Sequence, residues 1–156
     1  LTVLNCSENQ LTSLDLSTLN SLIELRCNDN QITSIDLNGL TALNQFNCSD
    51  NLITTLNLGA VMNLRTLWCE TNQLTSIDLN NNTALTNLYC DFNQLTSIDL
   101  SSNFLLEDLR CIGNQITSLD LSNNIALDFL VCNGNQLTSL DLTNNIALTG
   151  LYCGGN

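Results

Sequence analysis

Residues 85–105 read LTNLYCDFNQLTSIDLSSNFL, and the same arrangement of residues recurs along the whole chain. Cysteine is the clearest marker of the recurrence, because all eight cysteines lie 21 residues apart. They are Cys6, Cys27, Cys48, Cys69, Cys90, Cys111, Cys132 and Cys153. A fixed period of this length indicates a repeat architecture, in which each unit buries its apolar side chains against its neighbours.

Each repeat has two similar halves. The first half follows L-x-x-L-x-C-x-x-N at residues 85–93, and the second follows L-x-x-I-x-L-x-x-N at residues 95–103. Apolar and polar residues alternate in both halves, as side chains do along an extended strand. The short segments rich in Asn, Ser and Thr between the halves leave no room for a helix of three turns. The sequence therefore predicts a β-rich solenoid, a right-handed coil with two parallel β-sheets and one short strand per turn in each.

This pattern resembles the 21-residue bacterial leucine-rich repeats called the IRREKO class, L-x-x-L-x-C/L-x-x-N-x-L-x-x-L-D-L-x-x-N. The match covers the whole chain as seven full repeats and a partial eighth in one register. The resemblance implies a leucine-rich repeat fold in a secreted or cell-surface bacterial protein. The sequence is more distantly similar to the internalins, which bind host proteins on their concave sheet. The early repeats depart from the pattern, because Leu19, Leu40 and Val61 replace the second Asn and Asn57 replaces the Asp of L-D-L.

The two ends of the chain both lie inside the motif. Leu1 already belongs to a repeat and Asn156 stops within one, and no capping segment is recognisable. Solenoid ends need caps because their outermost turn has only one neighbour. We therefore expect residues 1–156 to form a single leucine-rich repeat domain that is a segment of a longer protein.

The composition argues against several classes of function. Three Arg, no Lys and fifteen acidic residues give a formal net charge of -12, which disfavours binding to nucleic acid or to anionic membrane surfaces. The chain has no His, so neither His-containing catalytic triads nor His-ligated metals are available. No apolar run approaches the roughly 18 residues that a membrane span requires. We expect no enzyme activity, no catalytic residue, no cofactor, no metal site and no membrane insertion.

Two interior columns are interpreted as structural. The first Asn of each repeat should satisfy the backbone groups that the chain leaves unpaired as it bends out of the first strand. This column comprises Asn9, Asn30, Asn51, Asn72, Asn93, Asn114, Asn135 and Asn156. Parallel stacking holds neighbouring cysteine Cβ atoms side by side, which suits disulfide geometry poorly. Free buried thiols are therefore predicted, with disulfides or metal binding as the alternatives.

The Asp residues of the L-D-L segments form an acidic column along the second halves of the repeats, and only Asn57 interrupts it. Its members are Asp15, Asp36, Asp78, Asp99, Asp120 and Asp141. A solvated face that resists aggregation explains these residues simply. A calcium-binding ladder is the alternative, because stacked carboxylates are hard ligands, although no recognised calcium motif is present.

The outward positions of the first strand differ from repeat to repeat, unlike the rest of the motif. The residues directly before the cysteines are Asn5, Arg26, Asn47, Trp68, Tyr89, Arg110, Val131 and Tyr152, which include the single Trp and both Tyr. Exposed aromatic residues and Arg commonly anchor recognition surfaces. The predicted ligand-binding residues are Trp68, Tyr89, Glu70, Asp91, Arg110, Arg26, Phe129 and Tyr152.

Stacking of the repeats predicts a cluster within this surface. Trp68 and Tyr89 become neighbours, Glu70 lies beside Asp91, and Arg110 lies next to Tyr89 and Asp91. A purely structural interpretation remains open, in which the aromatic rings cover the sheet and Arg110 neutralises Asp91 or Asp108.

The favoured function is a non-catalytic protein-binding or adhesion module, a choice that rests partly on the resemblance of the fold. A carbohydrate-binding module is an alternative, because Trp68 or Tyr89 can stack on a sugar ring while Glu70, Asp91 and Asn87 bond its hydroxyls. A structural spacer between other domains is another alternative. Glycoside hydrolysis by Glu70 and Asp91 is disfavoured, because no apolar pocket is evident to raise one pKa.

Overall fold

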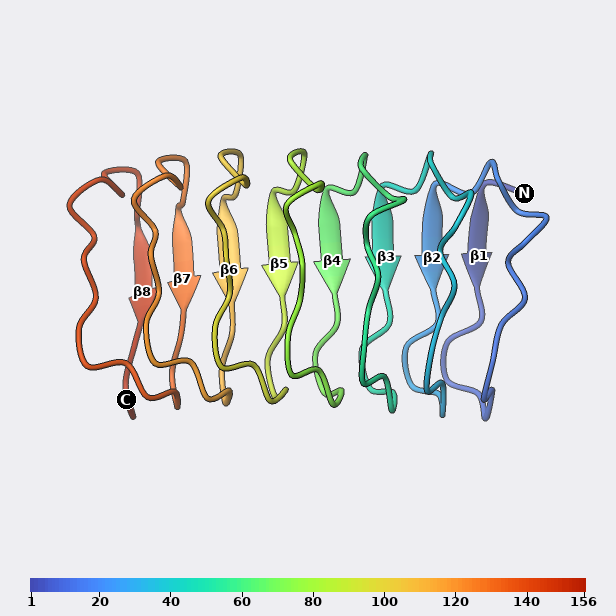
Figure 1. The fold of residues 1–156 in the computed structure, drawn as a ribbon, viewed down its shortest axis with the longest axis horizontal. Helices are drawn as coiled ribbons and strands as arrows, with labels where there is room; N and C mark the ends of the chain where they lie inside the picture. Colours follow the sequence, from blue (N-terminus) through green and yellow to red (C-terminus); the bar gives the residue numbers. More distant parts are fainter.

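Each repeat forms one turn of a solenoid and contributes one three-residue strand to a single parallel sheet (Figure 1). The computed structural model describes residues 1–156 and contains no helix. The strands are β1 (Val3–Asn5), β2 (Glu24–Arg26), β3 (Gln45–Asn47), β4 (Thr66–Trp68), β5 (Asn87–Tyr89), β6 (Asp108–Arg110), β7 (Phe129–Val131) and β8 (Gly150–Tyr152). They are ordered β1 to β8 across the sheet, so sequence neighbours are also spatial neighbours.

The repeat period sets the strand register. Leu67 pairs with Leu88 and Trp68 pairs with Tyr89, each 21 residues further along the chain. The middle residue of each strand points into the coil, and the first and third residues point outward. The predicted solenoid of parallel strands is confirmed, and the variable positions do form one face of the sheet.

The second predicted sheet does not form. In the L-D-L segments the apolar side chains are buried and the Asp between them is exposed, as in Ile98, Asp99 and Leu100. No ladder joins these segments. Asp99 Oδ1 accepts the backbone N–H of Ser101 at 3.0 Å, which turns the chain directly after the L-D-L segment. The alternating pattern correctly indicated half-buried extended chain, but extended chain pairs into a sheet only when its hydrogen-bonding groups face the next turn.

The core is one continuous stack of apolar columns along the solenoid. In a central turn Leu64, Leu67, Cys69 and Leu74 are completely buried. These side chains repeat every 21 residues, so each packs against its equivalents in the turns before and after. The last turn has one neighbour only, and Leu151 in β8 is 42% exposed.

The first Asn column joins neighbouring turns, as the sequence predicted. The Asn72 Nδ2 group donates to the carbonyls of Cys48 (2.9 Å), Cys69 (3.3 Å) and Glu70 (3.2 Å). Its Oδ1 accepts the N–H of Ile53 at 2.9 Å. One buried amide thus bonds backbone groups of its own turn and of the preceding turn, where the sheet ladder no longer reaches them.

The second Asn column is bonded less completely. The Asn103 Nδ2 group donates to the carbonyls of Leu79 (3.3 Å) and Asn82 (2.9 Å), but its buried Oδ1 has no hydrogen-bond partner. Asn82, Asn124 and Asn145 share this arrangement. In earlier turns the equivalent Leu40 and Val61 fill the same buried position without a polar group. The second column is therefore not required for closing a turn.

The cysteines form a ladder of free thiols. Cys27, Cys48, Cys69, Cys90, Cys111 and Cys132 are fully buried, Cys6 is half-buried and Cys153 is exposed. Several thiols donate to a backbone carbonyl of the next turn, as Cys90 Sγ does to Arg110 at 3.3 Å. The prediction of free buried thiols is confirmed for these six cysteines, whereas the two terminal ones are free but not fully buried. Burial raises the pKa of Cys27 to about 12 and that of Cys132 to about 11, so these thiols are unreactive at neutral pH.

Asn72→Leu is expected to lower the free energy of unfolding by about 1–3 kcal/mol, because it leaves the buried N–H of Ile53 without a partner. Asn103→Leu is the matched control. It removes an unbonded oxygen, and the carbonyls of Leu79 and Asn82 keep backbone donors at 3.0 Å. Urea unfolding should therefore show little loss or a gain for Asn103→Leu. Equal losses in the two variants would contradict the different roles of the columns.

Thiol titration with an aromatic disulfide should distinguish the two ends from the interior. Cys153 is expected to react first in the folded protein, Cys6 more slowly, and the buried thiols only on unfolding. After denaturation without reductant, all eight cysteines should react. A lower total would show that disulfides form in the protein.

Raising the pH from about 8 to about 10.5 should lower stability. Above about pH 8.5 unfolded thiols ionise, whereas the raised pKa values keep Cys27 and Cys132 protonated in the fold. The folded state then binds more protons than the unfolded state, and the free energy of unfolding falls as pH rises. The urea midpoint measures this decrease, which should be smaller in a Cys27→Ala/Cys132→Ala variant. An identical decrease in that variant would assign the effect to other groups.

Candidate functional site

The outward face of the sheet carries most of the predicted binding residues. Trp68, Tyr89, Arg110 and Tyr152 end strands β4, β5, β6 and β8, and Phe129 begins β7. Because the third residue of every strand points outward, consecutive turns bring these side chains together across the sheet. Tyr152 is 56% exposed, and the others are partly buried by their neighbours.

These five side chains form a continuous series of contacts, which we call the sheet-face row. The Trp68 and Tyr89 rings are stacked, with centroids 5.8 Å apart and an interplanar angle of 27°. Arg110 Cζ lies 5.0 Å from the Tyr89 ring centroid and 5.4 Å from that of Phe129. The centroids of the Phe129 and Tyr152 rings are 5.7 Å apart. The separations follow from the strand spacing of about 4.8 Å, which suits stacked rings and a guanidinium.

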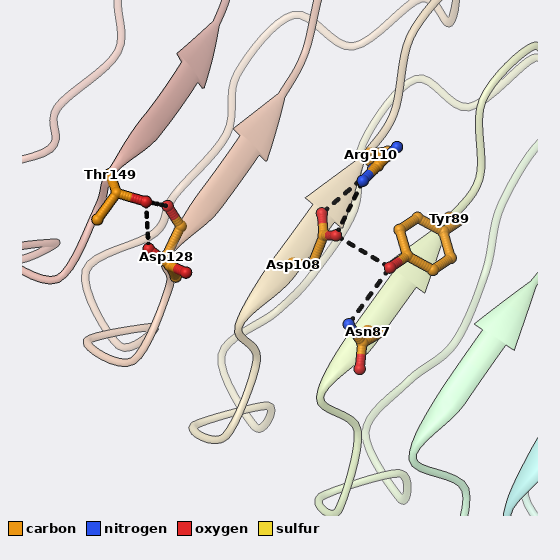
Figure 2. Close-up of polar contacts among 6 residues, drawn as sticks. All are labelled: Asn87, Tyr89, Asp108, Arg110, Asp128 and Thr149. Carbon is orange, nitrogen blue, oxygen red and sulfur yellow. Dashed lines mark hydrogen bonds and ion pairs between the residues drawn. The ribbon is translucent and has the colours of Figure 1, made fainter.

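Asp108 holds the middle of the row in place (Figure 2). Its Oδ2 accepts the Tyr89 hydroxyl at 2.9 Å, and Arg110 donates from Nε and Nη2 to its two oxygens at 3.3 and 3.2 Å. Asn87 Nδ2 donates to the same Tyr89 hydroxyl at 3.3 Å. Burial and the hydrogen bond to Asp108 raise the pKa of Tyr89, so its hydroxyl stays a donor. Arg110 contacts Tyr89 as predicted, and its ion pair is with Asp108 rather than Asp91.

Gly150 makes room for one end of the row. A Cβ atom at this position would collide with the Phe129 ring, so the ring lies directly over the glycine. The missing side chain lets Phe129 lean across β8 and reach Tyr152. Phe129 therefore joins the row from a different outward column than the other four residues.

Glu70 and Asp91 lie two residues beyond Trp68 and Tyr89 and are both half-buried. The Ser49 hydroxyl donates to Glu70, and the N–H of Ile112 donates to Asp91 Oδ1 at 2.6 Å. Burial is the main cause that raises the pKa of both carboxyls. The charge of Asp91 raises the pKa of Glu70 further. Neither carboxylate forms an ion pair, since the two ion pairs of the structure are Arg26 with Glu24 and Arg110 with Asp108.

Arg26 is not brought to this cluster. It ends β2 and pairs with Glu24 of the same strand at 2.6 Å. Strand β3 separates it from Trp68, and Asn47 occupies the intervening position. Arg26 still lies on the outward face of the sheet, so its role in binding stays a prediction for a part of that face away from the cluster.

Phe92 is an exposed aromatic residue outside the predicted binding set. It is 58% exposed and has a φ of 53°, in the left-handed region that bulky residues seldom adopt. Its ring lies against Gly113, and later turns place Gly at the equivalent position, as in Gly113 and Gly134. The sequence does contain a signal for this exposed ring, because Phe92 stands where the next repeats have Gly.

The acidic column lies on the opposite side of the coil, in the L-D-L segments. An open hollow there is lined by polar residues that include Asp120, Ser122, Asp141 and Thr143. Hydrogen bonds from Ser122 lower the pKa of Asp120, and those from Thr143 lower the pKa of Asp141. No three His, Cys, Asp or Glu side chains come close enough together to hold a metal ion. None of the chain forms an apolar helix of membrane-spanning length.

Comparisons with known proteins identify relatives by structure. No protein-family model and no curated protein sequence matches the chain. Internalin J of Listeria monocytogenes, whose functional domain includes a cysteine ladder, matches 99% of this chain and 44% of its own, with 30% identity and a TM-score of 0.71. Internalin C2 of the same species matches 97% of this chain and 80% of its own, with 26% identity and a TM-score of 0.74.

A third structure extends the likeness beyond Listeria. The leucine-rich repeat protein LIC12759 of Leptospira interrogans matches 96% of this chain with a TM-score of 0.88 and 21% identity, which shows the fold alone. The chain spans less than half the length of internalin J and of LIC12759. Since the turns follow those of the internalins over nearly all of the chain, this protein is a leucine-rich repeat solenoid of the kind found in these bacterial proteins.

Proposed function

We propose that the chain is a non-catalytic binding module of a secreted or cell-surface bacterial protein, and that it recognises a protein ligand through the sheet-face row. The observation that carries the proposal is the row itself, in which aromatic rings and Arg110 make contacts across β4 to β8 on an outward face. Tyr, Trp and Arg are the residues most often found at energetic centres of protein interfaces.

The distribution of variation along the repeats supports this function. Interior columns and the L-D-L face change little between turns, because every turn must pack and bend in the same way. The outward positions of the sheet are free of that requirement and range from Asn47 to Trp68 to Val131. The resemblance to internalins, which bind host proteins on the corresponding sheet, supports the same face and the same extracellular setting.

Shape and hydrogen bonding favour a protein over the alternatives. The hollows lined by the L-D-L segments and by the C-terminal end include no residue of the row, which lies on the open face of the sheet rather than in a sugar pocket. Tyr89 and Asn87 bond each other, which leaves fewer polar groups for sugar hydroxyls. Glu70 and Asp91 each accept a hydrogen bond from a neighbouring turn, Glu70 from the Ser49 hydroxyl and Asp91 from the N–H of Ile112, which leaves fewer of their oxygens free for a sugar.

Trp68→Ala/Tyr89→Ala is expected to weaken binding to a protein ligand about 30-fold or more, because it removes two stacked anchors. The chain would be screened against an array of extracellular protein domains and a glycan array, and affinities of the resulting ligands measured by calorimetry. Thr75→Ala/Thr96→Ala is the matched control, since it changes exposed residues of the same two turns off the row.

Three results would overturn the proposal. Undiminished protein binding by the Trp68→Ala/Tyr89→Ala variant, with its circular dichroism unchanged, would remove the row from the site. Ligands found on the glycan array alone would establish the carbohydrate alternative. Absence of ligands on both arrays would favour a spacer.

A further inference from the structure

The charge around the row is unevenly balanced. Of the three arginines, Arg26 and Arg110 are already paired with acids of their own strands, and Arg65 lies exposed before β4. Near Trp68, in contrast, Glu70 interacts with the like charges of Asp91 and Asp50, and the one cation that acts on these acids is Arg110, at Asp91, which is already paired with Asp108. The end of the row formed by β4 and β5 therefore carries uncompensated negative charge next to stacked aromatic rings.

The other end of the row shows how this sheet holds a cation. The Arg110 guanidinium lies between the rings of Tyr89 and Phe129, and the Asp108 carboxylate binds it from the same strand. Ring, carboxylate and cation come into contact because outward residues of adjacent strands are one strand spacing apart. Aromatic faces and carboxylates both attract cations, and partial burial strengthens both interactions.

The same two kinds of group occur at Trp68 without the cation. The neighbours of Trp68 and Glu70 on the preceding turn are Asn47 and Ser49, which are short and uncharged. The Asn47 side chain is turned to its own backbone, where Oδ1 accepts the N–H of Ser49 at 3.0 Å. No cation lies over the Trp68 ring, and neither Glu70 nor Asp91 forms an ion pair; Arg110, whose charge acts on Asp91, is already paired with Asp108.

We propose that the Trp68–Tyr89 stack, together with Glu70 and Asp91, receives an arginine or lysine side chain of the partner, so that the protein ligand presents a basic segment here. This inference rests on the proposed function and names the chemistry of the ligand at that site. The net charge of -12 favours the same class of partner at long range, because it attracts basic proteins before contact.

Trp68 is the only tryptophan of the chain, so its fluorescence reports on this site directly. The probe is a blocked octapeptide of alternating Ser and Arg, compared with the same peptide carrying neutral citrulline or Glu in place of Arg. The Arg peptide should change Trp68 emission saturably and more weakly at high salt. The citrulline and Glu peptides should have no saturable effect.

Glu70→Gln/Asp91→Asn should weaken binding of the Arg peptide roughly tenfold or more. The matched control is Asp99→Asn/Asp120→Asn, which removes the same charge from the opposite face and keeps the acceptors for Ser101 and Ser122. This control should change the affinity less than about twofold, because its charges are distant and screened. Calorimetry provides the affinities, and circular dichroism confirms that both variants fold.

Either of two outcomes with the peptides would overturn the inference. Equal binding of the citrulline peptide would mean that the rings bind without need of a cation, and equal losses in the two acidic variants would mean that only the overall charge attracts the peptide. The proposed function is tested separately by the array-selected ligand. If that ligand requires Trp68 and Tyr89 but neither Glu70 nor Asp91, the basic-segment inference fails and the binding function stands. If it requires none of them, both fail.

Discussion

The hydrogen bonds that join one turn to the next are the interaction on which this structure depends. Strands of three residues provide few ladder bonds, and the chain then leaves the sheet and bends around the core. The first Asn column bridges that bend, since each buried amide bonds carbonyls of two turns and accepts an N–H of the preceding turn. Without it, every turn would bury unsatisfied backbone groups, whose desolvation is unfavourable.

This constraint separates the molecule into a constant and a variable part. Interior Leu and Cys columns, the Asn column and the L-D-L turns must repeat, because each serves the same packing or hydrogen-bonding need in every turn. The outward positions of the sheet carry no such need. A surface of unlike side chains can therefore change without altering the coil, and residues 21 positions apart in the chain become contacts across adjacent strands.

The sheet-face row illustrates how these neighbours determine one another's chemistry. Asp108 bonds both Tyr89 and Arg110, which fixes the ring and the guanidinium and neutralises the charge at one end. Two strands away Glu70 is bonded only by the Ser49 hydroxyl and keeps its negative charge unpaired. The row thus has a charge-balanced end at β6 and β7 and an acidic end at β4 and β5. This uneven charge is the basis for the proposed preference for a ligand with a basic segment.

The sequence alone determined the solenoid, its interior columns, the free thiols and the neighbourhood of Trp68 and Tyr89, because a strict period sets both the register and the residues that face inward. Only the tertiary structure decided that the L-D-L segments form no sheet, that Arg110 pairs with Asp108, and that Phe129 lies over Gly150. A period places Cα atoms side by side, but rotamers and the direction of backbone hydrogen bonds depend on the space and partners that the adjacent turns supply.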